Sequence, residues 1–362
     1  MATTNEKEEI QLDKPLILAS RFWRTFANPW DSWTGTPSSK PFELFKFVVT
    51  DEDNSGIPSE KELDKTLPVE KPNLDEFKTS PENGIRTMWI GHATVLVQFD
   101  GLTVLTDPIF SERCGPPLIS PTRYRPTPCR IGELPDIDAV VISHNHYDHL
   151  DKNSVRELQM KYGPKLKWYV PLGLKKWLKD VGCEKVEELN WWGEDDYNDK
   201  FKFVCLPCQH WSKRGALDTN WTLWCSWAVL GPKHRFYFGG DTGYCPVFKT
   251  IGQKYGKFSL AAIPIGAYEP RKFMKTQHIN PEEAVQIHQD IKAERSLGIH
   301  WGTFKLTYEP YLEPREKILQ IVKEKNLKEG AFFTLNHGQI KVIQSLDDAT
   351  QPANTETETS VK

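Results

Sequence analysis

Histidine and aspartate residues gather in the ten-residue stretch 142–151, ISHNHYDHLD. His144 and His146 are two residues apart, so an extended backbone sends both side chains to the same side, and Asp148 and His149 follow where the chain turns. Zinc binds imidazole nitrogen and carboxylate oxygen at about 2.0–2.2 Å, and four such ligands so close in sequence cannot all reach one ion without strain. The stretch therefore predicts two adjacent metal ions. A histidine-rich surface loop is disfavoured, because unpaired imidazoles at the end of a buried strand are costly.

Three further candidate ligands each follow a strand-like segment. His210 comes after KFVCLPCQ, Asp241 after FYFGG, and His300 after SLGI. Side chains beside the turn residues at strand ends are presented at the edge of a sheet. A carboxylate such as that of Asp241 can bridge two ions, and the glycines beside it let the backbone approach closely. Two metal ions per chain are expected, with zinc preferred, although such ligands also suit iron and manganese.

These ligands must be positioned by a scaffold of many short strands with a few helices between them. The two-residue Asp100-Gly101 predicts a hairpin, and Pro281 followed by two glutamates predicts a helix start. The pattern favours two sheets with helices packed outside, a four-layer αββα arrangement, although propensity alone does not separate it from other mixed α/β (α+β) folds. Strands are expected at 87–90, 94–99, 102–107, 137–143, 167–170, 202–206, 222–230, 235–240, 260–266, 296–300 and 331–335, and helices near 152–162, 246–256, 281–292 and 313–325.

The chain divides into three segments by composition. Residues 1–83 form an aromatic and polar extension that we expect to wrap the core, because no strand or helix period holds there for long. Residues 84–345 form the catalytic domain, and the polar residues 346–362 are expected to be a disordered tail.

The composition of the 362 residues excludes several classes of function. A net charge of −3 without a basic stripe argues against nucleic acid as a partner. No apolar run approaches the ~20 residues that cross a bilayer, and the polar N-terminus lacks the apolar core of a signal peptide. The seven scattered cysteines are typical of free thiols in a reducing compartment. The protein is therefore expected on the cytoplasmic side of any membrane.

The motif HNHYDH at 144–149 resembles the HxHxDH motif of the metallo-β-lactamase superfamily, and the later order of His, Asp and His matches it too. The resemblance covers roughly residues 84–345. It implies that His144, His146, His210 and Asp241 hold one zinc ion, and that Asp148, His149, Asp241 and His300 hold the second. It further implies that Asp107 orients the site from behind the ligands.

A narrower resemblance rests on WIGHATVLVQFDG, TDPIFSERCGP, GGDTGY and the tryptophan-rich stretch 221–227. These segments are similar to the N-acyl-phosphatidylethanolamine-hydrolysing phospholipase D family, although a bacterial ascorbate-lactonase branch shares the GHATVL-type opening. The resemblance implies that Asp148 and Asp241 act with a bridging hydroxide, which attacks phosphorus. Tyr147, Gln277 and His278 would line the substrate pocket.

Two alternative functions use the same residues. A lactonase or another small-ester hydrolase would need a small polar pocket. A zinc-stabilised lipid-binding protein is the alternative without catalysis, but structural zinc sites are normally closed and rich in cysteine. For the phospholipase, the substrate lies in a membrane, so we expect peripheral contact with intracellular membranes. The sequence leaves a homodimer open.

Some residues allow two interpretations. His92 either touches the site or is a structural histidine, and Cys205 and Cys208 are expected to be ordinary buried thiols rather than half of a zinc knuckle. An aromatic group in the extension faces a lipid surface, clamps the extension onto the core, or does both. Its members are Phe22, Trp23, Phe26, Trp30 and Trp33.

Overall fold

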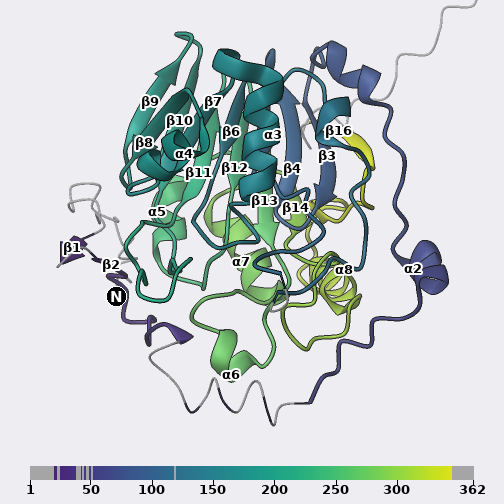
Figure 1. The fold of residues 1–362 in the computed structure, drawn as a ribbon. Helices are drawn as coiled ribbons and strands as arrows, with labels where there is room; N and C mark the ends of the chain where they lie inside the picture. Colours follow the sequence, from purple (N-terminus) through teal and green to yellow (C-terminus); the bar gives the residue numbers. More distant parts are fainter. Residues whose placement is uncertain are drawn as a thin grey trace, which may run out of the picture.

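The computed structural model describes residues 20–22, 25–37, 42, 45, 49, 52–117 and 120–344. Two seven-stranded sheets dominate it (Figure 1). The first has the order β16 (Ile340–Ile343), β3 (Ile85–Gly91), β4 (Thr94–Phe99), β5 (Leu102–Thr106), β6 (Ala139–Val141), β7 (Lys167–Pro171) and β8 (Lys185–Leu189). The second has the order β15 (Phe332–Phe333), β14 (Ser296–Ile299), β13 (Leu260–Pro264), β12 (Arg235–Phe238), β11 (Ser226–Leu230), β10 (Phe201–Leu206) and β9 (Glu194–Tyr197).

Alternating side chains explain why the first sheet is buried on both faces. In β4, Val95 and Val97 join the large apolar core between the two sheets, whereas Leu96 points to a second core under the outer helices. Trp89 and Met88 of β3 divide in the same way. Side chains with a period of two therefore supply two apolar layers from one strand, which is what a four-layer αββα sandwich requires.

Helices cover the outer face of each sheet. Helices α3 (Lys152–Tyr162) and α4 (Lys175–Val181) pack on the first sheet, where they share the second core with it. Helices α5 (Val247–Lys254), α7 (Pro281–Asp290) and α8 (Glu313–Glu324) pack on the second sheet, and α7 contacts both α5 and α8. The short helix α6 (Arg271–Met274) precedes α7. The predicted αββα arrangement is confirmed, and α7 begins at the expected Pro281.

Several elements escaped the sequence analysis. Strands β8 (KVEEL) and β9 (EDDY) lie at sheet edges and carry mostly charged residues, so no alternation of apolar residues marks them. The predicted strand 222–230 begins only at Ser226, and the edge strand β16 was not predicted.

The described part of the N-terminal extension contains a few short elements. Strands β1 (Ser20–Phe22) and β2 (Thr25–Ala27) form a small hairpin, and helix α2 (Glu60–Thr66) lies on the opposite side of the molecule (Figure 1). No period was found in this region because α2 spans only seven residues, of which Leu63 alone is buried. The segment 73–79 adds the 3-10 helix η2 (Leu74–Lys78), and the core domain adds η3 (Ile131–Glu133) and η4 (Gly163–Lys165).

Two predictions concern residues outside the described part of the chain. One is the disordered tail 346–362, and the other is the role of Trp23 and of the Phe22 side chain in the aromatic group. Within the described part of the chain, none of the helices combines the length and the apolar character that would let it cross a bilayer.

Candidate metal centre

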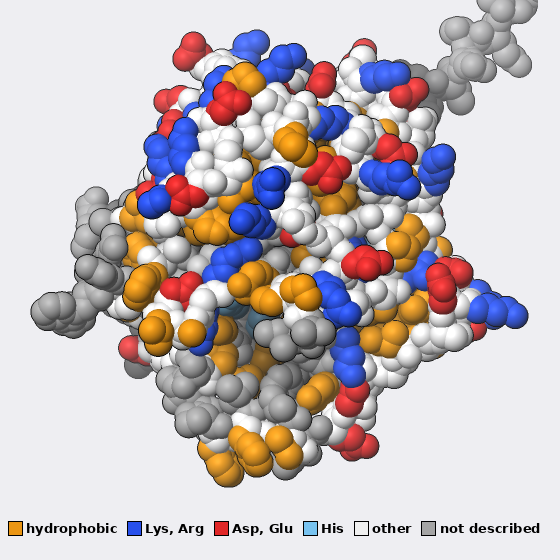
Figure 2. All heavy atoms as spheres, viewed as in Figure 1, with side chains coloured by type: hydrophobic (Ala, Val, Ile, Leu, Met, Phe, Trp, Pro, Cys, Tyr) orange, Lys and Arg blue, Asp and Glu red, His pale blue; other side chains and the backbone are white. Residues whose placement is uncertain are grey.

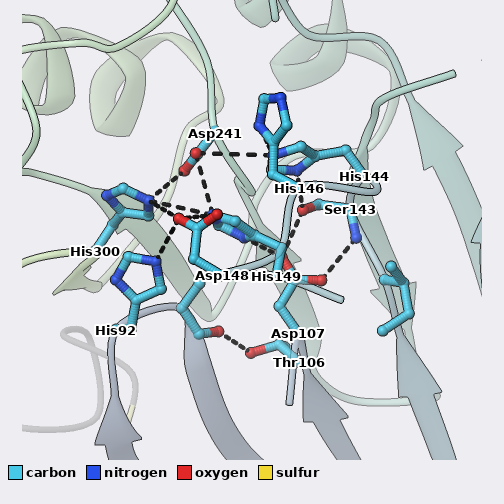
Figure 3. A network of polar contacts seen from close by, with 12 residues as sticks. His92, Thr106, Asp107, Ser143, His144, His146, Asp148, His149, Asp241 and His300 are labelled. Carbon is cyan, nitrogen blue, oxygen red and sulfur yellow. Dashed lines mark hydrogen bonds and ion pairs between the residues drawn. The ribbon is translucent and has the colours of Figure 1, made fainter. Parts of the chain in front are cut away.

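The seven predicted ligands come together in one cluster, and Figure 3 labels all of them except His210. The loop between β6 and α3 supplies four of them, and the segments after β10, β12 and β14 supply one each. Segments that are distant in sequence therefore meet because their strands end at the same edge. The seven are His144, His146, Asp148, His149, His210, Asp241 and His300.

The imidazoles form one tight group in the first half of the site. Nε2 of His144 lies 2.8 Å from Nδ1 of His146, and Nε2 of His210 lies 3.3 Å from the same Nδ1. In the second half, Oδ2 of Asp148 lies 3.3 Å from Nε2 of His149 and 3.6 Å from Nε2 of His300. Each half thus presents three donor atoms within the reach of one ion.

Asp241 lies between the two halves. Its Oδ2 is 3.1 Å from Nε2 of His149, 3.9 Å from Nε2 of His144 and 3.8 Å from Nε2 of His210. Its Oδ1 is 3.1 Å from Nε2 of His300. One carboxylate therefore faces both groups of imidazoles, which is the geometry that a bridging ligand needs. Metal binding by the seven residues stays a prediction.

The charges of the site favour a cation. Burial disfavours charge on every imidazole here, and with neighbouring imidazoles it holds the pKa of His144 well below its usual value and lowers the pKa of His146 to about 3. Burial opposes the charged form of Asp241 as well, but the adjacent His149 and His300 hold the pKa of Asp241 well below its usual value. Burial also opposes charge on His149 and His300, but Asp241 and Asp148 hold the pKa of His149 well above its usual value and raise the pKa of His300 to about 9. The ionised carboxylates therefore favour a positive charge in this half of the site, and a bound metal ion would take the place of these protons.

Three polar atoms in the site support the fit to a metal. Nε2 of His146, Oδ1 of Asp241 and Nδ1 of His278 are buried without a hydrogen-bond partner among the described residues. Buried polar atoms are almost always satisfied, so such a group of orphaned donors and acceptors indicates an absent ligand, ion or water. With the converging donor atoms, the residues fit a pair of metal ions.

Asp107 supports the ligands from behind. Its Oδ2 accepts a hydrogen bond from Nδ1 of His149 at 2.7 Å and another from the hydroxyl of Ser143 at 2.5 Å, while Oδ1 accepts from the Ser143 amide at 2.7 Å (Figure 3). The Ser143 hydroxyl also contacts Nδ1 of His144 at 2.9 Å. Asp107 therefore touches one ligand directly and a second through Ser143, in the place that the resemblance implied for it.

His92, which the sequence left open, touches the site. Its Nε2 lies 2.9 Å from Oδ2 of Asp148, and its ring centroid lies 4.0 Å from that of His300. Its backbone has φ +52° and is fixed from three sides, because its carbonyl accepts from the amide of His300 and from the Trp89 ring, and its amide donates to Thr303. A non-glycine residue in this region is uncommon, and such strain clusters at functional sites.

The extension is attached to a ligand-bearing loop. Asn28 donates a hydrogen bond to the carbonyl of His210 at 2.7 Å, and Ser32 donates to the side chain of Gln209 at 2.5 Å. Phe26 and Trp30 are only 4 % and 6 % exposed, and the Trp30 ring lies 5.3 Å from that of Trp191. For these two residues the clamping interpretation is confirmed and the lipid-facing one is wrong.

A cavity of about 450 Å³ opens onto the cluster. In Figure 2 a histidine side chain is visible in a hollow with both basic and hydrophobic side chains at its rim. Apolar side chains such as Trp211, Phe273 and Met274 form much of its wall. An apolar wall beside a polar floor suits a ligand with a long hydrocarbon part and one polar reacting group.

The predicted substrate residues all line this cavity. Tyr147 donates its hydroxyl to the carbonyl of Arg214 at 2.9 Å, so its hydroxyl is already engaged. The Gln277 side chain accepts a hydrogen bond from the Trp211 ring at 2.7 Å. His278 reaches furthest in, with Nδ1 at 3.9 Å from Oδ2 of Asp241. Their contacts with a substrate stay predictions.

Sequence reasoning missed Arg214 and Trp211, which also line the cavity. Trp211 follows the ligand His210 directly, which was a usable signal, but nothing in the sequence marks Arg214. Cys205 and Cys208 are buried, as expected.

Comparison with known proteins agrees with this geometry. The model of the β-lactamase superfamily domain matches residues 103–301. The N-acyl-phosphatidylethanolamine-hydrolyzing phospholipase D 1 of Caenorhabditis elegans is 45 % identical over 93 % of this chain and 96 % of its own. The mitochondrial enzyme of the same name from Saccharomyces cerevisiae is 33 % identical over 85 % of this chain and 73 % of its own. Among solved structures, the metallo hydrolase Igni18 of Ignicoccus hospitalis shares the fold with a TM-score of 0.55 at 19 % identity, over 72 % of this chain and 98 % of its own.

Proposed function

This chain belongs to the N-acyl-phosphatidylethanolamine-hydrolysing phospholipase D family of the metallo-β-lactamase superfamily, and we propose that it cleaves N-acyl-phosphatidylethanolamine to an N-acylethanolamine and phosphatidic acid. The observation that carries the proposal is the group of histidine and aspartate side chains at the floor of an apolar cavity. The cavity suits acyl chains, and the floor suits hydrolysis of a phosphodiester.

The proposal includes two zinc ions per chain. His144, His146, His210 and Asp241 would hold one, and Asp148, His149, Asp241 and His300 the other. A pair of such ions supplies an activated solvent nucleophile and neutralises phosphate charge when bound. The distances of Asp241 to both halves of the site support its place as the shared ligand.

The surrounding residues have distinct tasks in this proposal. Asp107 accepts from His149 and so leaves Nε2 of that imidazole free to bind. His278, whose Nδ1 has no hydrogen-bond partner among the described residues, would contact the phosphate or the amide of the substrate. The ring of Tyr147 would pack against the acyl amide. The apolar wall excludes water from the acyl chain.

The alternative as a small-ester hydrolase or lactonase is less well supported. A lactonase would need a small polar pocket, whereas Trp211, Phe273 and Met274 give this cavity an apolar wall. The lipid-binding alternative without catalysis conflicts with the family, because the relatives named above are hydrolases.

We also propose peripheral contact with an intracellular membrane, from the cytoplasmic side. The loop 211–222, here called the wall loop, lines the cavity through Trp211 and residues 213–215, and it also carries Leu217 and Trp221, which are 85 % and 46 % exposed. Exposed apolar side chains on a loop that lines the cavity suit insertion into the headgroup region. In this proposal Leu217 and Trp221 take the lipid-facing role that Phe26 and Trp30 cannot have, because those two residues are buried in the core.

The proposed reaction is tested by its products in heavy-oxygen water. Attack of solvent at phosphorus places the heavy oxygen in phosphatidic acid and leaves the N-acylethanolamine unlabelled. The purified chain, with zinc added, would be incubated with N-acyl-phosphatidylethanolamine and both products analysed by mass. Label in the N-acylethanolamine, or hydrolysis at an acyl ester instead, would refute the assignment.

A further inference from the structure

Arg214 lies in the wall loop and lines the cavity beside the metal centre. Its guanidinium carbon is 4.1 Å from the centroid of the Tyr147 ring and 4.9 Å from that of the Trp177 ring. Nη1 donates a hydrogen bond to the carbonyl of Asn145 at 3.1 Å, between two of the predicted ligands in sequence. The guanidinium is therefore held by two aromatic rings and one hydrogen bond, which restricts its rotamers before any ligand arrives.

No carboxylate of the described residues makes a close ion pair with this guanidinium. Asp151, Asp218 and Asp148 interact with it electrostatically only at longer range, and Asp218 has other hydrogen-bond partners. Its carboxylate accepts from the backbone amides of Arg214 and Gly215, the latter at 2.7 Å. By contrast, Arg271 of α6 is paired with Glu283. A half-buried cation without a close counter-ion is costly unless an anion joins it.

The cation and the cavity suit the anionic part of a lipid phosphodiester. Arginine presents a planar fork of N–H donors that matches phosphate oxygens, and it remains charged at any physiological pH. Hydrogen bonds between charged partners are roughly twice as strong as neutral ones, and a half-buried site strengthens them further. Lys213 and the carboxylates of Asp148 and Asp241 line the same cavity, so the guanidinium would bind an anionic group beside the metal centre rather than in its place.

We propose that Arg214 is a substrate-binding residue that donates hydrogen bonds to a non-bridging phosphate oxygen of the lipid, and thereby selects phosphodiesters over uncharged esters. The proposal rests on the proposed function for the identity of the substrate. The phosphate is shared by the substrate and by the product phosphatidic acid, so both should depend on this residue.

The test compares Arg214→Gln and Arg214→Lys with the wild-type chain, and uses Lys275→Gln as the matched control. Lys275 is an exposed cation next to Met274 in sequence and does not line the cavity. On N-acyl-phosphatidylethanolamine in mixed micelles, Arg214→Gln should raise KM roughly 10- to 100-fold, as expected for a lost charge-assisted hydrogen bond. Arg214→Lys should recover part of the loss, and Lys275→Gln should stay within about twofold of wild type.

A binding measurement without turnover separates this proposal from the proposed function. Soluble dihexanoyl phosphatidic acid should raise the melting temperature of the zinc-loaded wild type and of Lys275→Gln, but not that of Arg214→Gln. Dihexanoylglycerol, which lacks the phosphate, should raise the melting temperature of none of the three. If the wild type does not hydrolyse the lipid yet shows this pattern, the reaction is wrong and the Arg214 site stands.

Three results would overturn the Arg214 site. One is an unchanged KM together with unchanged stabilisation by phosphatidic acid in Arg214→Gln. Another is a KM rise accompanied by lost zinc or a lowered melting temperature in both Arg214 variants, because the arginine would then only brace the loop. The third is an equal effect of Lys275→Gln. If Arg214→Gln does not fold, Arg214→Lys decides between these outcomes through its partial loss.

Discussion

Asp107→Asn isolates the support that one buried carboxylate gives to the metal centre. The substitution keeps the size of the side chain, and asparagine tolerates the φ of +30° found here. One oxygen can still accept from the amide of Ser143, but the new NH₂ group then faces Nδ1 of His149 and the Ser143 hydroxyl, which donate to Asp107 in the native protein. The tautomer of His149 that leaves Nε2 free to bind is no longer favoured.

The size of the effect follows from these contacts. Loss of an outer partner of a metal ligand typically weakens metal affinity about 10- to 100-fold, or about 1.4–2.7 kcal/mol. An unsatisfied buried donor costs a further 1–3 kcal/mol or so of folding free energy. We therefore expect zinc to bind at least about tenfold more weakly, and the metal-free protein to melt at a lower temperature.

A competition titration with a chromophoric zinc chelator measures the affinity, and thermal unfolding of the same samples measures the stability. Asp138→Asn is the matched control, because Asp138 also accepts a backbone hydrogen bond, from Thr103, and is not a member of the metal cluster. Zinc affinity in Asp107→Asn equal to that of wild type and of Asp138→Asn would show that Asp107 does not orient His149.

Three further outcomes are expected. Chelation should abolish activity, and about two zinc ions per chain should restore it. Asp241→Ala should lose metal and activity together, because one carboxylate faces both groups of imidazoles. An active Asp241→Ala variant would exclude the bridging role. His92→Ala should weaken zinc binding about tenfold, which the same chelator titration checks, and unchanged binding would make His92 purely structural. Trp30→Ala should lower the free energy of unfolding, measured in urea, by about 3–5 kcal/mol, and it should lower activity equally on vesicles and on a short-chain analogue. The double variant Leu217→Ser/Trp221→Ser should instead weaken binding to vesicles and leave activity on the analogue unchanged. The reverse pattern would restore the lipid-facing interpretation of Trp30.

Secondary structure was predictable wherever apolar residues dominate a segment. The strands that became β4 and β13 are buried along their length, so their residue types alone indicated them. The strands β8 and β9 were missed because edge strands can carry charge, and charge leaves no periodic pattern. Helix α2 was missed because a helix of seven residues depends on its contacts, such as the ion pair between Arg125 and Asp64, more than on its own sequence.

The aromatic extension shows where sequence reasoning must stop. The spacing of Phe26 and Trp30 was compatible with a lipid surface and with a clamp, because both environments favour the same residue types. Only the packed structure placed Trp30 against Trp191 and Asn28 on the carbonyl of His210. The choice depends on segments more than 150 residues away, which no local pattern contains.

The sequence by itself determined which residues form the candidate centre, since HNHYDH and the three later strand ends carry imidazole and carboxylate groups whose chemistry suits metal wherever they meet. The tertiary structure decided how these groups share the site: it set Asp241 between the two groups of imidazoles, brought His92 against Asp148, and placed the guanidinium of Arg214 in the cavity wall. The reason is physical. The type of a side chain fixes which atoms it can bind, but the distances between strand ends depend on how two sheets pack, and that packing is a property of the whole core.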